Sequence, residues 1–172
     1  MQGYTKTQHI KTMKHIKYFL YITFIFIVAA GISACSQQKE SQAKSTDAEP
    51  VNVTMYKNPD CQCCLKWAAY MEDNGFSVTQ KPTNKLASVK YQYGVPNNLG
   101  SCHTALVDGY VVEGHVPVEA INKLLKERPD AKGVAVAGMP ASAPGTQGKN
   151  GGPYEVFVFD GQGNQSVYGT YE

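Results

Sequence analysis

Three cysteines crowd into the four positions Cys61-Gln62-Cys63-Cys64, and this cluster limits the possible folds more than any other feature. An alternating, β-branched stretch precedes it at residues 51–56, and Asn58-Pro59-Asp60 ends that strand. The cluster then opens a helix predicted within residues 61–76, which Gly75 is placed to end. The exposed N–H groups and the dipole of a helix N-terminus favour thiolate over thiol. The sequence therefore predicts a thiolate-rich turn between a strand and a helix.

The remaining elements follow in an order typical of an α/β domain. A short strand is predicted at 77–80, a helix at 84–93, and a hairpin whose arms, 105–107 and 110–112, flank Asp108-Gly109. Pro117 opens another helix at its first position, residues 138–153 form an irregular loop, and 155–159 pairs with 165–168 as a closing hairpin. The element order and the position of the cysteines predict a thioredoxin-like α/β domain with an added C-terminal β-hairpin.

The first 34 residues are predicted to be a lipoprotein signal peptide. Lysines precede an apolar run at 19–30 that is too short to span a bilayer comfortably. The segment ends in Ile32-Ser33-Ala34-Cys35, which resembles the bacterial lipobox and predicts lipidation of Cys35. Ser36 follows where an aspartate would favour retention at the inner membrane, so we expect anchoring at the outer membrane, facing the periplasm. The alternative is an ordinary cleaved signal with a cysteine there by chance.

Residues 35–50 lack aromatic and branched apolar side chains and are predicted to be a flexible tether, which leaves 51–172 as the folded domain. The whole chain has 16 basic and 14 acidic side chains. Four of the basic ones lie in the signal, at Lys6, Lys11, Lys14 and Lys17. The remainder is therefore slightly acidic, and no basic field indicates a nucleic-acid partner.

The number and spacing of the cysteines favour metal binding over disulfide exchange alone. Cys61 and Cys64 have the Cys-x-x-Cys spacing of redox proteins, but Cys63 adds a third thiol that would compete with the resolving one. Cys102-His103 lies just before the predicted hairpin, where redox members of the fold place a cis-proline, and no proline stands at 101–104. In an oxidising envelope, thiols end as disulfides or are held by metal.

The predicted ligand set is soft. It comprises Cys61, Cys63, Cys64, Cys102, His103, His115 and Met139. Thiolate, thioether and imidazole suit Cu(I), whereas zinc takes thiolate and imidazole but rarely thioether, so zinc is the second choice. There are more of these ligands than the four that one tetrahedral ion takes, and bridging thiolates would allow more than one copper ion to bind. His103 has an alternative role as an edge histidine bonded to backbone, and Met139 as a methionine that fills a gap.

Several motifs occur together in a recognisable order. They are Met55-Tyr56-Lys57 with Pro59, the cysteine cluster with Lys66-Trp67, Gly94-Val95-Pro96, Ser101-Cys102-His103-Thr104-Ala105, Glu113-Gly114-His115-Val116-Pro117 and Gly138-Met139-Pro140. Across about residues 52–168 the chain resembles a bacterial family catalogued as a domain of unknown function, which includes periplasmic copper-resistance proteins of the CopG type. The resemblance implies a thioredoxin-like fold, copper binding at the cysteines and a role in copper tolerance. Thr146 stands where the family usually has a second methionine, and Ala137 where it often has proline.

We therefore expect an envelope lipoprotein that captures Cu(I) at the helix N-terminus and protects the cell from excess copper. Its expected partners are copper ions, the membrane through the lipid anchor, and envelope proteins that handle copper. No catalytic residue is assigned. The rival functions are a thiol–disulfide oxidoreductase using Cys61 and Cys64, and a structural zinc module. A structural disulfide beside a spare buried thiol is the remaining alternative for the cluster.

Overall fold

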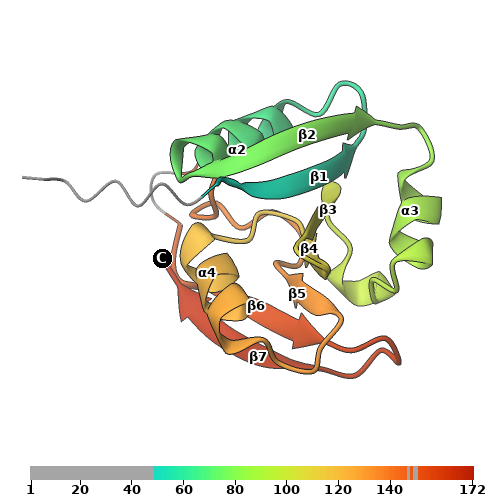
Figure 1. The fold of residues 1–172 in the computed structure, drawn as a ribbon, viewed down its shortest axis with the longest axis vertical. Coiled ribbons are helices and arrows are strands. Elements are labelled where there is room, and N and C mark those ends of the chain that lie inside the picture. Colours follow the sequence, from blue (N-terminus) through green and yellow to red (C-terminus); the bar gives the residue numbers. More distant parts are fainter. Residues whose placement is uncertain (1–48, 147, 149–150) are drawn as a thin grey trace, which may run out of the picture. The chain divides into compact units, whose positions relative to one another are not determined.

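The computed structural model describes residues 49–146, 148 and 151–172, which form a mixed α/β fold around one seven-stranded sheet (Figure 1). The strands are β1 (Val51–Lys57), β2 (Phe76–Pro82), β3 (His103–Val107), β4 (Tyr110–Glu113), β5 (Gly133–Ala135), β6 (Tyr154–Phe159) and β7 (Gln165–Tyr171). The helices are α2 (Gln62–Asp73), α3 (Leu86–Gln92) and α4 (Val118–Glu127), with a 3₁₀ turn at Asn97–Leu99.

The strands lie in the order β2-β1-β3-β4-β5-β6-β7. The pairs β1–β2 and β4–β5 are parallel, and the other four neighbouring pairs are antiparallel. The helix α2 connects the first parallel pair, as such a crossover requires. Because β1 and β3 run in opposite directions, the end of β1 lies beside the beginning of β3, with Lys57 opposite His103. This register brings the α2 N-terminus and the segment before β3 to one end of the sheet.

The predicted elements are present, and their limits differ by at most three residues. The β3–β4 hairpin turns at Asp108 and Gly109, both with positive φ (46° and 89°), as a type I′ turn requires. Pro117 is the N-cap of α4 and not its first helical residue. The strand β5 was not predicted, because three residues are too few to give a periodic signal. The predicted signal peptide, Cys35 and the tether up to residue 48 lie outside the described residues.

Two apolar clusters lie on opposite faces of the sheet. The helix α2 buries Cys64, Trp67, Ala68 and Met71, which recur at helical spacing, and α4 buries Val118, Ala120, Ile121 and Leu124. Both sets belong to one cluster with alternate residues of β1, β3 and β4. A smaller cluster on the other face contains Val95, Leu99, Val111, Ala135 and Phe159. The helix α2 lies against β1 and β2, and α4 lies beside β6 and β7 (Figure 1).

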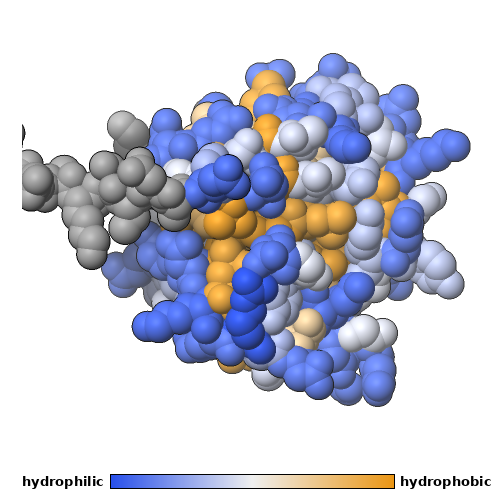
Figure 2. Space-filling view, viewed as in Figure 1, coloured by the Kyte–Doolittle hydropathy of each residue, from blue (hydrophilic) through white to orange (hydrophobic). Residues whose placement is uncertain are grey.

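The face of the domain seen in Figure 2 is largely hydrophilic. Figure 2 shows hydrophobic side chains in a strip across the middle of one face, between the region of β1, β2 and α2 and the helix α4. Over the described residues, no helix is both long enough and apolar enough to cross a bilayer.

The short strand β5 depends on a glycine at its first position, Gly133. A Cβ atom built there would lie 1.9 Å from the carbonyl oxygen of Val111 on the neighbouring strand. We expect Gly133→Ala to destabilise the domain by about 2 kcal/mol, because a backbone contact this close forces the strands apart. Urea unfolding measures this, and Gly161→Ala is the matched control because nothing lies within 4 Å of its Cβ position. Equal midpoints for the two variants would contradict the prediction.

Candidate metal centre

Four sulfur atoms converge where α2 begins. Cys61 is the N-cap residue of α2, and Cys63 and Cys64 lie in its first turn. Cys102 directly precedes β3. The four Sγ atoms all lie within 4.8 Å of one another. The Sγ of Cys63 is 3.4 Å from that of Cys61 and 3.7 Å from that of Cys102. The pairing of β1 with β3 thus joins cysteines that are about 40 residues apart in sequence.

Two of these sulfurs are bonded to each other. Cys61 and Cys64 form a disulfide, and Cys63 and Cys102 are free thiols. The disulfide joins the two cysteines that have Cys-x-x-Cys spacing. Burial, the proximity of Cys63 and a hydrogen bond with it together raise the pKa of Cys102 to about 12. Without metal, Cys102 is therefore a protonated thiol at neutral pH.

Two histidines complete the centre around Cys102. The donor atoms of Cys102, His103 and His115 also lie within 4.8 Å of one another. The Nδ1–H of His115 donates to the carbonyl oxygen of Pro144 at 2.6 Å, so its Nε2 carries the lone pair. That Nε2 lies 2.9 Å from the Sγ of Cys102. A backbone acceptor that fixes the ring in this way is the usual support of a metal-binding histidine.

His103 is fully buried beneath the cysteines. Its Nδ1 lies 3.6 Å from the Sγ of Cys102, and its Nε2 has no hydrogen-bond partner among the described residues. The ring of Trp67 stacks against it with centroids 4.5 Å apart, and the Trp67 Nε1–H donates to the carbonyl of Val116. Burial, with the nearby His115 and Lys90, holds the pKa of His103 well below its ordinary value. Burial also lowers the pKa of His115, so both rings are neutral and able to ligate a metal.

A buried carboxylate holds the segment that carries Cys102 and His103. Glu113 accepts hydrogen bonds from the backbone N–H of Ser101 at 2.6 Å and the hydroxyl of Thr104 at 2.7 Å, and it pairs with Lys90. Burial raises the pKa of Glu113, whereas Lys90 and the two hydrogen bonds oppose that rise. Because its partners flank Cys102 and His103 on both sides, Glu113 fixes where these two residues lie relative to β4.

The predicted long loop packs over the centre. Ala143 is buried, and the Cβ position of Gly145 lies 3.0 Å from the carbonyl oxygen of Cys63 and 2.7 Å from the amide nitrogen of Trp67. The hydroxyl of Thr146 bonds to carbonyls within the same loop. Met139 is 58% exposed, although the neighbouring Gly138 carbonyl accepts a hydrogen bond from Ser101. The exposed thioether is thus carried by a loop that touches the centre.

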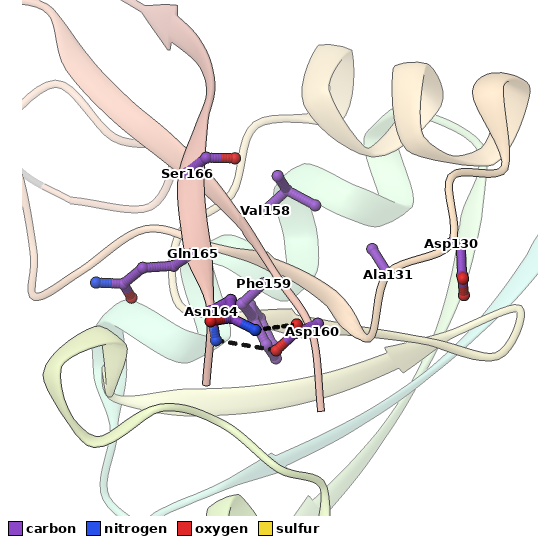
Figure 3. A pocket seen from close by; sticks show the side chains of 8 residues that line it. All are labelled: Asp130, Ala131, Val158, Phe159, Asp160, Asn164, Gln165 and Ser166. Carbon is purple, nitrogen blue, oxygen red and sulfur yellow. Dashed lines mark hydrogen bonds between the residues drawn. The ribbon is translucent and has the colours of Figure 1, made fainter. Parts of the chain in front are cut away.

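A second hollow, of about 300 Å³, lies elsewhere, between Asp130 and the turn that joins β6 to β7 (Figure 3). The carboxylate of Asp160, one of the two that line it, already accepts hydrogen bonds from Gln162 and Asn164 in its own turn. None of the predicted ligands lines this hollow. It therefore contributes nothing to the metal centre.

The sequence did not identify the supporting groups. Glu113 stands in an apolar strand, and its partner Lys90 is 23 positions away, so only the fold brings them together. The carbonyl of Pro144 leaves no side-chain signal at all. A charged residue at the end of an otherwise apolar strand was the available hint, because buried carboxylates need partners.

Residues 99–146, which include Cys102, His103, His115 and Met139, match the family described as "Protein of unknown function, DUF411". A solved structure named "Copper resistance protein copG- Form 2" is 41% identical, with a TM-score of 0.68 over 72% of this chain and 100% of that one. Another, named "Copper resistance protein copG- Form 1", is 41% identical with a TM-score of 0.67 over 72% of this chain and 98% of that one. No curated protein sequence matches significantly.

The burial of His103 predicts a specific behaviour toward acid. Its folded-state pKa is lowered, so as the pH falls the unfolded chain takes up this proton first, near about pH 6.5. His103 therefore removes stability from the metal-free domain below that pH. NMR of the imidazole nitrogens should show His103 neutral at about pH 6 in the folded protein and titrating near about 6.5 in urea. A folded-state midpoint equal to the one in urea would contradict this.

Proposed function

Because the chain belongs to the family of the copper resistance protein CopG, we propose that it binds Cu(I) and lowers the concentration of free copper ions. One observation carries the proposal. The Sγ atoms of four cysteines lie within 4.8 Å of one another, and one of them, that of Cys102, also lies within 4.8 Å of the donor nitrogens of two histidines. Sulfur and imidazole donors suit Cu(I). Zinc accepts the same donors and is the second choice.

Each proposed ligand has a place in the capture of copper. Cys63 lies in the first turn of α2 and is a free, half-buried thiol that an arriving ion can reach. Cys102, just before β3, and the Nε2 of His115, just after β4, close the site. His103, with an unpartnered buried nitrogen, supplies a further donor. Met139 is the outermost candidate, a thioether exposed on the covering loop.

We further propose that the centre holds more than one copper ion. The donor atoms form two overlapping groups, Cys61, Cys63, Cys64 and Cys102 in one, and Cys102, His103 and His115 in the other. A thiolate shared between such groups is suited to bridging two ions. Six donors also exceed the four that a single tetrahedral ion uses.

The copper-binding form is the reduced one, in which Cys61 and Cys64 are thiols. Their disulfide, with the Sγ of Cys63 at 3.4 Å from that of Cys61, favours thiol–disulfide exchange as the second candidate function. Two features weigh against it as the main activity. The third thiol competes with the resolving one, and no cis-proline stands beside the cysteines among the described residues.

We also propose a thioredoxin-like classification and an envelope location. The order β2-β1-β3-β4, with α2 joining the parallel pair and α4 following the hairpin, supports the classification. The names of the matched copper resistance proteins and the lipobox-like end of residues 1–34 support an envelope lipoprotein. Its lipid would be attached at Cys35, followed by a tether to residue 50 and the copper-binding domain at 51–172. Copper-handling proteins of the envelope would be its partners.

The ligand assignment predicts how binding responds to loss of a sulfur. Cys63→Ser and Cys102→Ser should each lower the Cu(I) affinity of the reduced protein at least about 100-fold, because even an outer-shell change costs about 10- to 100-fold. Competition with a chromogenic Cu(I) chelator measures the affinity, and native mass spectrometry counts the ions. Gln62→Ala, exposed in the same helical turn, is the matched control and should bind as the unaltered protein does.

Two results would contradict the copper proposal. One is retention of full Cu(I) affinity by both cysteine variants. The other is vigorous insulin reduction by metal-free protein that is unaffected by Cys63→Ser, which would make the oxidoreductase the better assignment. Saturation of the unaltered protein at one ion would remove the multinuclear part alone.

The lipoprotein assignment is tested separately. Cys35→Ser should move the protein from the membrane fraction to the soluble envelope fraction, because the lipid anchor has no other attachment point. Metabolic labelling with a fatty-acid analogue should mark the unaltered chain and not the variant. An unlabelled chain that is cleaved before Cys35 would identify an ordinary signal peptide.

A further inference from the structure

The last residue of β1, Lys57, is a buried cation beside the metal centre. It is only 3% exposed, and alternation along the strand places it on the same face as Val53 and Met55. That face also carries α2. In the β1–β3 register Lys57 stands directly opposite His103, whose ring contacts Cys102. Its side chain therefore points toward the elements that carry the ligands.

The ammonium group of Lys57 holds the turn that leads into the cysteines. Its Nζ donates to the carbonyl of Asn58 at 3.2 Å and to that of Pro59 at 2.9 Å. The carbonyl of Asn58 also accepts the backbone N–H of Cys61 at 3.2 Å. Lys57 and Cys61 thus share one acceptor, and the cation lies against the turn that sets the position of the helix N-cap.

The charge of Lys57 has no counter-ion in the described part of the chain. The ion pairs formed there are Lys90–Glu113, Lys123–Glu127 and Arg128–Asp108. Lys90 pairs with Glu113, and Asp60 and Lys66 near the cysteines are exposed to solvent. A buried charge without an opposite charge nearby is costly. The described residues around Lys57 therefore lack a negative charge that would offset its ammonium group.

The reduced cysteines supply that anion. Two or more thiolates that bind one Cu(I) ion carry a net negative charge, and here Cys64 is buried while Cys61, Cys63 and Cys102 are half-buried. We propose that Lys57 is a positioning residue of the copper centre: it fixes the turn at Cys61 and offsets the negative charge of the thiolates. This inference rests on the proposed copper function. The disulfide form carries no thiolate at Cys61 or Cys64, so the electrostatic part of the effect belongs to the reduced protein.

The test compares a variant that loses a buried lysine with one that loses an exposed lysine. Lys57→Met should lower the Cu(I) affinity of the reduced protein by about tenfold or more, because the variant loses both the cation and the hydrogen bonds that hold the turn before Cys61. Lys66→Met removes an exposed cation from α2 and should change the affinity less than about twofold. In the metal-free reduced protein, ultraviolet thiolate absorbance should appear at higher pH in Lys57→Met than in either the unaltered chain or Lys66→Met. Lys57→Arg, which keeps the charge, should restore most of the affinity.

The outcomes separate this inference from the proposed function. If the unaltered protein fails to bind Cu(I), the function is wrong whatever Lys57 does. If the unaltered protein binds Cu(I) and Lys57→Met has the same affinity and the same thiolate titration, the role of Lys57 is overturned while the proposed function stands. Thermal unfolding of the disulfide form identifies a variant that has lost its fold, in which case Lys57→Gln, neutral but able to donate a hydrogen bond, replaces it. Failure of both neutral variants to fold when oxidised would make Lys57 a structural residue and overturn the proposal.

Discussion

The hydrogen bonds of the buried Glu113 carboxylate hold the metal centre together. Glu113 binds the backbone of Ser101 and the side chain of Thr104, and so clamps the two residues between them, Cys102 and His103, against β4. The same strand continues into His115, whose Nε2 then meets the Sγ of Cys102 at 2.9 Å. A buried carboxylate that lost these partners would be costly, so the network is formed completely or the centre loses its geometry. The sulfur and nitrogen donors are thus positioned by an interaction that includes none of them.

Protons, a second sulfur and metal compete for the same cysteines. In the structure one pair is satisfied as a disulfide, while Cys102 keeps its proton because burial raises its pKa to about 12. In the proposed function, a soft cation would displace the proton and, once the disulfide is reduced, could bind all four sulfurs. The buried, neutral imidazoles suit this exchange because they add donors without adding charge. Metal binding at the proposed centre would therefore be coupled to both proton release and reduction.

Much of the fold could be predicted from local patterns. The β-branched stretch that became β1, the Asp108-Gly109 turn with its two positive φ angles and the apolar face of α4 each follow from nearby residues. The strand β5 could not be predicted, because its three residues are held by pairing with β4 and β6 and carry no period of their own. For the candidate site, sequence spacing gave the ligand types, but it could not indicate that Met139 is exposed while His103 is fully buried.

The sequence by itself determined which chemistry is present: three thiols at a helix N-terminus, a Cys-His pair before a hairpin and a histidine after it. These features depend only on residue type and on short spacings along the chain, which the covalent sequence gives directly. Only the tertiary structure decided which of these groups meet, that Glu113 and Pro144 orient them, and that Lys57 lies buried beside them. The reason is physical. Contacts between residues 12 to 40 positions apart depend on strand register and on the burial of charge, and neither can be read from a short stretch of sequence.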